Sequence, residues 1–185
     1  MNLNDIQIRK TNTKDFNDII EVETLAFGHD KEAELTAGLL ADKTAEPILS
    51  LLAFYENEAI GHILFTRVFL DEMTADQPLM HILAPLAVKP NCQKQGIGGV
   101  LIDEGLKLLK EMGSEMVFVL GHMEYYPRFG FIPDARKHGF TTMYPIPEEF
   151  ANAWMVLPFN QNAFDNRSGK IVCCEELNKP EHWRE

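Results

Sequence analysis

The sequence has few of the residues that would indicate an extracellular, metal-binding or membrane protein. Its 185 residues include only 3 cysteines, an odd number that leaves one thiol unpaired and excludes a disulfide framework. No cysteines or histidines have the paired spacing of a zinc site. The amino terminus lacks the apolar stretch of a signal peptide. The longest apolar run, residues 48–55, is far shorter than the ~20 residues that span a bilayer. We therefore expect a cytoplasmic protein without a metal site or a membrane partner.

Positive charge is also scarce, because 17 Lys and Arg residues stand against 28 Asp and Glu, for a formal net charge of −11. Nonspecific nucleic-acid binding rests on clustered positive charge, so we expect no nucleic-acid partner. An acidic surface attracts cationic ligands, although it also serves solubility. The length suffices for one buried core, and no linker, repeat or low-complexity stretch interrupts the chain. The sequence therefore predicts a single domain over residues 1–185.

Hydrophobic periodicity predicts strands alternating with helices. A hairpin turn is expected at Asn57 and Glu58, and a polar break at 71–76. The expected strands lie at 6–10, 48–55, 59–70, 80–88, 115–121, 153–158 and 169–175. The first expected helix is capped by Thr13, carries Asp15 in its first turn and ends at Gly28. Two more are expected after Asp30 and at about 97–112. With a short helical turn after 121, the order is β-α-α-β-β-β-α-β-α-β-β. Strand–helix–strand across 80–121 implies a parallel crossover, so we expect an α/β (α+β) fold with a mixed sheet covered by helices.

A strand that enters a glycine-bearing turn and then a helix, over residues 83–99, carries the strongest functional signal. Such a turn points backbone N–H groups outward, and a helix N-terminus adds about half a positive charge. Together they suit a phosphate group. The absence of Gly-Lys-Ser/Thr excludes a Walker A loop, and Leu101 stands where a dinucleotide fingerprint needs its third glycine. A tight connection without a ligand remains the alternative for this loop.

Pro85 interrupts the strand that precedes this loop. Proline cannot donate to a sheet ladder, so inside a strand it marks an edge or a bulge. If the neighbouring parallel strand leaves beyond that point, the N–H groups of Leu86 and Val88 lose their sheet partners. A row of free N–H groups leading to an anion loop would suit a long ligand with amides and phosphates; an ordinary bulge is the alternative.

Two segments stand out, the loop Gln93 to Gly98 with the strand before it and the Tyr-rich segment Tyr125 to Phe131. Both resemble the GNAT superfamily of N-acetyltransferases. Gln93 to Gly98 is similar to the Gln/Arg-x-x-Gly-x-Gly/Ala signature of this superfamily, and the residues from 86 onward are similar to the strand that precedes the signature. Tyr125 to Phe131 is similar to its aromatic-Tyr-x-x-x-Gly-Phe segment. The opening of the chain and the order of elements also match, and the details look most like the YhbS-like acetyltransferases of bacteria. The resemblance implies the GNAT fold, a mixed central sheet that splays after a bulged strand.

The resemblance also implies roles for individual residues, with acetyl-CoA or another short acyl-CoA as co-substrate. Backbone N–H groups of 93–99 would bind the pyrophosphate, and those of Leu86 and Val88 the thioester oxygen and pantetheine amides. Tyr126 matches the tyrosine that protonates the departing sulfur, with the adjacent Tyr125 as its alternative. The expected cofactor-binding residues are Leu86, Ala87, Val88, Gln93, Lys94, Gln95, Gly96, Ile97, Gly98 and Gly99.

The acceptor is expected to be a primary amine of a small molecule, which attacks the thioester directly in a ternary complex. A protein N-terminus or lysine is the first alternative, and a CoA-binding sensor without turnover is the second. A homodimer is expected because similar proteins commonly dimerise. The sequence does not single out the base that deprotonates the amine; the candidates are His29, Glu34, His81, His122 and Glu124.

Overall fold

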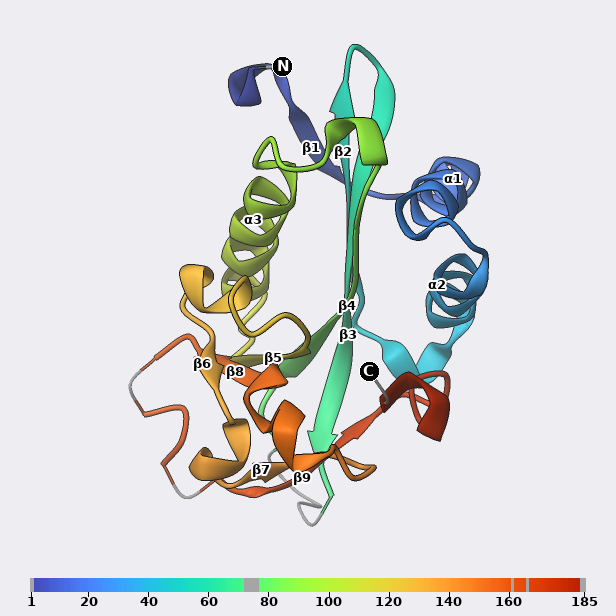
Figure 1. The fold of residues 1–185 in the computed structure, drawn as a ribbon. Coiled ribbons are helices and arrows are strands. Elements are labelled where there is room, and N and C mark those ends of the chain that lie inside the picture. The colour runs from blue at the N-terminus through green and yellow to red at the C-terminus, as the bar shows by residue number, and fades with distance from the viewer. Residues whose placement is uncertain (1, 72–76, 161, 166, 184–185) are drawn as a thin grey trace.

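The computed structural model describes residues 2–71, 77–160, 162–165 and 167–183. A long mixed sheet runs through the centre, with α3 on one face and α1 and α2 on the other (Figure 1). The helices are α1 (Phe16–Phe27), α2 (Lys31–Ala41) and α3 (Ile97–Glu111). The strands are β1 (Gln7–Lys10), β2 (Leu49–Tyr55), β3 (Glu58–Leu70), β4 (Met80–Val88), β5 (Met116–Leu120), β6 (Ile132–Pro133), β7 (Phe140–Thr141), β8 (Trp154–Pro158) and β9 (Gly169–Cys173). Most of the expected polar break, residues 72–76, lies outside the described residues.

The strand order is β1-β2-β3-β4-β5-β8-β6, and β9 pairs with the end of β3 that β2 does not cover. Neighbours along this path are antiparallel except for β4 and β5, which are parallel and are joined through α3. The short strand β7 adds a second parallel pair with β9. The mixed sheet and the parallel crossover predicted from the sequence are therefore confirmed.

Apolar side chains hold the helices against both faces of the sheet. On one face, Ile19 and Val22 of α1 are buried against β2, β3 and β4. On the other, α3 packs so closely that a Cβ atom on Gly105 would lie 2.5 Å from the ring of Phe65 on β3. The nearly continuous apolar strand β5 is buried on both faces, as its composition predicts. Within the described residues no helix is long and apolar enough to cross a membrane.

Three local expectations differ from the structure. The hairpin turn lies at Glu56 and Asn57, whose φ angles are 49° and 68°, so Glu58 already begins β3. Both residues take the left-handed conformation that a two-residue hairpin turn requires. The helix expected after β5 is only a 3-10 helix, Tyr126–Phe129, which ends at Gly130 with φ 92°. The two-residue strands β6 and β7 are too short to leave a periodic pattern in the sequence.

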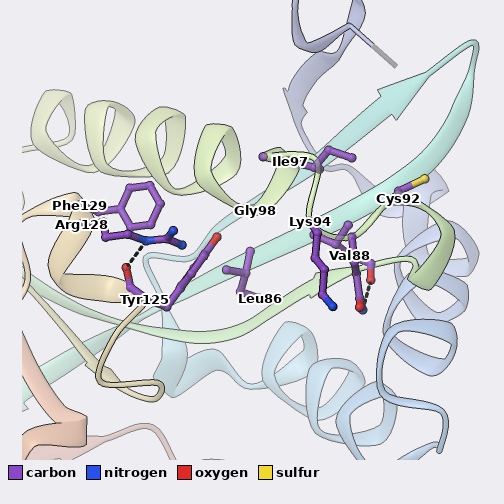
Figure 2. A pocket seen from close by; sticks show the side chains of 11 residues that line it. Leu86, Val88, Cys92, Lys94, Ile97, Gly98, Tyr125, Arg128 and Phe129 are labelled. Carbon is purple, nitrogen blue, oxygen red and sulfur yellow. Dashed lines mark hydrogen bonds between the residues drawn. The ribbon is translucent and has the colours of Figure 1, made fainter.

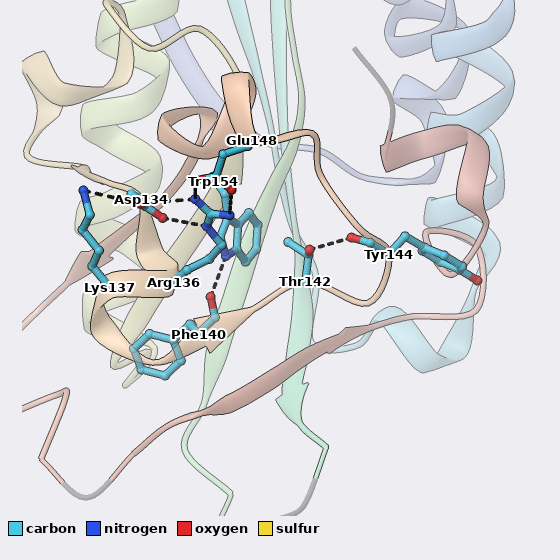
Figure 3. Close-up of polar contacts among 8 residues, drawn as sticks. All are labelled: Asp134, Arg136, Lys137, Phe140, Thr142, Tyr144, Glu148 and Trp154. Carbon is cyan, nitrogen blue, oxygen red and sulfur yellow. Dashed lines mark hydrogen bonds and ion pairs between the residues drawn. The ribbon is translucent and has the colours of Figure 1, made fainter.

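Polar contacts organise the region after β5, where regular elements are short (Figure 3). Arg136 donates to Asp134 at 2.8 Å and also to Glu148 at 2.8 Å, which fixes two loops to each other. The buried indole of Trp154 donates to the carbonyl of Phe140 at 3.0 Å. These contacts place β8 beside β5 and complete the core at the end of the molecule opposite the glycine-bearing loop (Figure 1).

Candidate active site

Strand β4 loses its partner β5 partway along its length. The two strands pair only as far as Leu83, which lies opposite Val119. The Ala84–Pro85 peptide bond is cis, and the pairing of β4 with β3 shifts register at this point. Beyond the bulge, β4 continues beside β3, whereas β5 ends at Leu120, still paired with β8. The splay after a bulged strand, expected from Pro85, is therefore confirmed.

One hydrogen bond fixes the direction of the N–H groups beyond the bulge. The backbone N–H of Lys89 donates to the carbonyl of Ile60, on the β3 side, at 2.9 Å. Because successive N–H groups of a strand point to opposite edges, those of Leu86 and Val88 point away from β3. In the described part of the chain, no strand pairs with that edge after Leu83. A ligand laid along β4 would find two aligned donors there.

The loop after β4 presents a second set of donors. Lys94 and Gly96 have φ angles of 60° and 91°, and Gly96 directly precedes α3 without a side-chain cap. The first backbone hydrogen bond into the helix comes from Val100, which donates to Gly96 at 3.1 Å. The N–H groups of residues 97–99 therefore lack helical acceptors. Together with the helix dipole they form an anion site that fits a pyrophosphate.

A cavity of about 540 Å³ connects β4, the loop, the start of α3 and the segment around the 3-10 helix Tyr126–Phe129 (Figure 2). Lys94 lies toward one end of the cavity and Arg128 toward the other, with Tyr125 and Leu86 between them. The lining residues are Leu86, Val88, Cys92, Gln93, Lys94, Gly96, Ile97, Gly98, Tyr125, Arg128 and Phe129. We call this cavity the groove.

Most of the residues that the sequence marked as cofactor-binding line this groove. The side chain of Gln93 donates to the carbonyl of Val88 at 3.0 Å and so ties the loop to the strand. Three predicted residues are not among those that line the groove. Ala87 packs on the α1 face, Gln95 donates to Asn91 at 3.1 Å, and Gly99 lies against Phe129.

The two adjacent tyrosines have different surroundings. Tyr125 lines the groove, and its hydroxyl lies 2.6 Å from where a Cβ atom on Gly98 would stand. Tyr126 is only 8% exposed, and its ring packs edge-to-face on Phe131 with 5.7 Å between ring centroids. It also contacts Gly121, at the end of β5 where that strand has left β4. Burial raises the pKa of both phenols, so each stays protonated at neutral pH.

The candidate bases lie in three separate places. His81 is fully buried and contacts Ser114 at 2.9 Å, and burial lowers its pKa to about 4. His29 is exposed in the turn before α2, and Glu34 is exposed on α2 itself. Only His122 and Glu124 lie near the groove: they line a second cavity of about 510 Å³, which also contains Tyr125 and Arg128.

Two features of the site were missed from the sequence. Arg128 and Phe129 were not expected to line the groove, although they belong to the same Tyr-rich segment as Tyr125 and Tyr126. The second feature is a buried network that links three elements under the β4 segment. His62 contacts Ser50 at 2.9 Å and Glu23 at 2.5 Å, and His62 pairs directly with Ala87 of β4. The described residues contain no cluster of three potential metal ligands.

Comparison with known proteins decides the family. The model of the acetyltransferase (GNAT) family matches residues 14–131. The chain belongs to the GNAT acetyltransferase family. The uncharacterized N-acetyltransferase YjhQ of Escherichia coli K12 is 55% identical over 166 residues, covering 89% of this chain and 90% of YjhQ. The GNAT fold and the identification as an N-acetyltransferase made from the sequence are confirmed.

Solved GNAT structures support the same conclusion. The structure of YhbS from Escherichia coli in complex with CoA superimposes with a TM-score of 0.83 at 28% identity, covering 94% of this chain and 92% of YhbS. A GNAT acetyltransferase from Brucella melitensis in complex with acetyl-CoA gives a TM-score of 0.72 at 29% identity, covering 94% and 98%. The expected likeness to YhbS is therefore confirmed.

Proposed function

We propose that this GNAT protein transfers an acetyl group from acetyl-CoA to a primary amine of a small molecule. The observation that carries the proposal is the order of donors along the groove. Leu86 and Val88 point their N–H groups to the edge of β4 that β5 has left, and the loop at the end of β4 opens the anion site at residues 97–99. Acetyl-CoA presents its thioester, two amides and a pyrophosphate in the same order. The two similar structures with CoA and acetyl-CoA support this choice.

In this proposal the backbone does most of the binding. The N–H groups at the start of α3 bind the pyrophosphate, and Lys94 adds a positive charge. The N–H groups of Leu86 and Val88 bind the thioester oxygen and a pantetheine amide. The hydrogen bond from Gln93 to the Val88 carbonyl holds strand and loop at a fixed distance. Because these donors belong to the backbone of regular elements, they are rigid before the ligand arrives.

Acetyl-CoA supplies an acetyl group activated as a thioester. The amine nitrogen attacks the carbonyl carbon, the C–N bond forms and the C–S bond breaks. A fixed N–H donor at the carbonyl oxygen, here that of Leu86, stabilises the charge that develops there. We assign proton donation to the departing sulfur to Tyr126, whose phenol is kept protonated by burial beside the splay.

The acceptor must be neutral when it attacks. For an amine with a pKa of ~10.4, deprotonation at pH 7 costs about 4.6 kcal/mol. The net charge of −11 raises the local concentration of ammonium groups. His122 and Glu124, both exposed in the cavity next to Tyr125, are the titratable side chains that we assign to removing the proton.

The first test is a thermal-shift measurement with acetyl-CoA, with ATP and NAD as controls. At a hundredfold excess over Kd, binding stabilises the folded state by ~2.7 kcal/mol. For a chain of this size the melting temperature then rises by roughly 5–11 °C. A rise specific to acetyl-CoA is expected. No rise would reduce the loop to a structural turn, and an equal rise with ATP would reduce it to a generic anion site.

The second test separates the acceptor classes by measuring CoA release with small primary amines, with a peptide that has a free N-terminus and with a lysine peptide. We expect turnover with small primary amines. Turnover with peptides alone would show a protein N-acetyltransferase. Specific binding of acetyl-CoA without turnover on any amine would indicate a sensor.

A further inference from the structure

The side chain of Arg128 is held against aromatic rings. Its carbon Cζ lies 4.6 Å from the ring centroid of Tyr125 and 5.9 Å from that of Phe129. Its Nε donates to the backbone carbonyl of Tyr125 at 3.3 Å. Stacking and this hydrogen bond restrict where the guanidinium can lie, and they leave its two terminal nitrogens for other partners.

Among the described residues, no carboxylate pairs with these terminal nitrogens. Three other arginines, Arg9, Arg136 and Arg167, each form an ion pair with a carboxylate. In a chain with a net charge of −11, a guanidinium without such a pair is available to an anion from outside the protein. Its planar fork of donors matches the two oxygens of a carboxylate.

Arg128 lies at the end of the groove where the acceptor must approach. Lys94, in the loop before the anion site, lies toward one end, and Arg128 lies toward the other, with Leu86 and Tyr125 between them (Figure 2). The N–H group of Leu86 marks the proposed thioester position. Arg128 is therefore beyond the thioester when seen from the pyrophosphate position.

A second cavity of about 510 Å³ begins at this end. It shares Tyr125 and Arg128 with the groove and adds His122, Met123 and Glu124. Within the part of the chain that the structure describes, the side chains of His122 and Glu124 form no hydrogen bond or ion pair. We call this space the acceptor cavity. It combines a restrained cation with two side chains that can accept a proton.

The cation selects among the possible amines. A plain alkylammonium ion would meet the like charge of Arg128, which opposes its binding. A carboxylate on the same molecule removes this repulsion and gains a bidentate, charge-assisted pair of hydrogen bonds. The acceptor cavity therefore favours a molecule that carries both an amine and a carboxylate.

We propose that the acceptor is a free amino acid, whose carboxylate binds Arg128 while its amine is acetylated. This inference rests on the proposed transfer of acetyl from acetyl-CoA to a small amine. The ammonium loses a proton to His122 or Glu124, and the neutral nitrogen attacks the thioester carbon. The C–N bond forms, the C–S bond breaks, and CoA leaves as a thiol. The carboxylate is unchanged, so the product is an N-acetyl amino acid.

The test measures steady-state CoA release with amino acids and with their primary amides, which keep the amine and the side chain but lose the carboxylate. The amides also have the less basic amine, so an enzyme that does not recognise the carboxylate should prefer them. Hydrogen bonds between charged groups predict that kcat/KM is about tenfold to a hundredfold higher for the amino acids.

Arg128→Gln should lower kcat/KM for the amino acids by that factor, chiefly through their KM. It should leave the amides and the KM for acetyl-CoA nearly unchanged. Lys94→Gln is the matched control: it should raise the KM for acetyl-CoA and keep the preference for amino acids over amides. Because Arg128 is exposed, its replacement should leave the melting temperature nearly unchanged, which checks folding.

Three results would overturn the inference. Amides could be used as well as amino acids by the unmodified protein, or plain amines could be used and amino acids not; in both cases the carboxylate is not recognised. Arg128→Gln could instead raise the KM for acetyl-CoA and slow both acceptor classes equally, which would assign Arg128 to the cofactor. If no small amine of any kind is acetylated, the proposed function itself fails, so the two failures are distinguishable.

Discussion

The hydroxyl of Tyr125 lies 2.6 Å from the position that a Cβ atom on Gly98 would occupy. This contact brings the segment around the 3-10 helix Tyr126–Phe129 against the first turn of α3, so two walls of the groove touch at one point. Any side chain larger than hydrogen at position 98 must displace the tyrosine. The width of the groove is therefore set by a glycine and a tyrosine that are 27 positions apart in the chain.

Gly98→Ala is the most direct probe of this contact. The added methyl group must displace the hydroxyl of Tyr125, a side chain that lines the groove, so we expect acetyl-CoA to bind several-fold more weakly. Tyr125→Phe removes the hydroxyl, after which the nearest ring atom lies 3.7 Å away, an ordinary contact. Calorimetric titration should therefore show a much smaller effect of Gly98→Ala in the Tyr125→Phe background. The same loss in both backgrounds would contradict the proposed contact.

Tyr126→Phe tests the assignment of the acid. Loss of a positioned proton donor should lower kcat by about a hundredfold, because general acid catalysis contributes factors of this size. The KM for acetyl-CoA should change little, because the substitution keeps the buried ring and removes only the hydroxyl that acts on the departing sulfur. Steady-state kinetics with the best small amine measures both.

Tyr125→Phe is the matched control, because it removes the neighbouring hydroxyl. It should change kcat by only a few-fold. If instead Tyr125→Phe abolishes turnover and Tyr126→Phe does not, the acid is Tyr125 and the assignment from the sequence spacing is wrong.

His81 should make stability depend on pH. Burial lowers its folded pKa to about 4, whereas an unfolded histidine titrates near 6.5. Between these values the unfolded state binds more protons, so stability falls as pH decreases from 6.5 toward 4. At pH 5 the loss amounts to about 2 kcal/mol relative to pH 7.5. Urea unfolding at the two pH values should show this loss, and His81→Asn, which cannot titrate, should lack it.

Ser50→Ala should destabilise the fold through the buried network. The hydroxyl of Ser50 contacts the imidazole of His62, and both residues are buried. Removing one partner of a buried hydrogen bond costs about 1–3 kcal/mol. Ser168→Ala, at an exposed position, is the control and should be neutral. Chemical denaturation measures the free energy of unfolding of both variants and of the unmodified protein. If Ser50→Ala is as stable as Ser168→Ala, the contact between Ser50 and His62 contributes nothing to stability.

The anion loop could be predicted because its signals are local. Glycines at 96 and 98 permit backbone conformations and close approaches that other residues disfavour, and a proline at 85 removes a sheet donor, whatever the neighbouring residues are. The bulge, the splay and the start of α3 at Ile97 all followed from them. These elements needed no knowledge of residues far away in the chain.

Other parts of the site depend on packing between distant segments. Tyr125 and Tyr126 differ by one position, and only the 3-10 helix determines which one lines the groove. The contact between Glu23 and His62 joins α1 to β3, and it follows from helix packing and strand register rather than from a sequence motif. The free terminal nitrogens of Arg128 likewise reflect what is absent around them within the described residues, which spacing along the chain does not encode.

The central claim is that the backbone of β4 and of the first turn of α3 binds acetyl-CoA. An amide-resolved NMR titration of isotope-labelled protein with acetyl-CoA tests it most directly, because each N–H group reports for itself. We expect the largest shifts at Leu86, Val88 and residues 96–99, with small changes at Lys89, whose N–H already donates to Ile60. Saturable binding that leaves those amides unchanged and shifts others would place the cofactor site elsewhere.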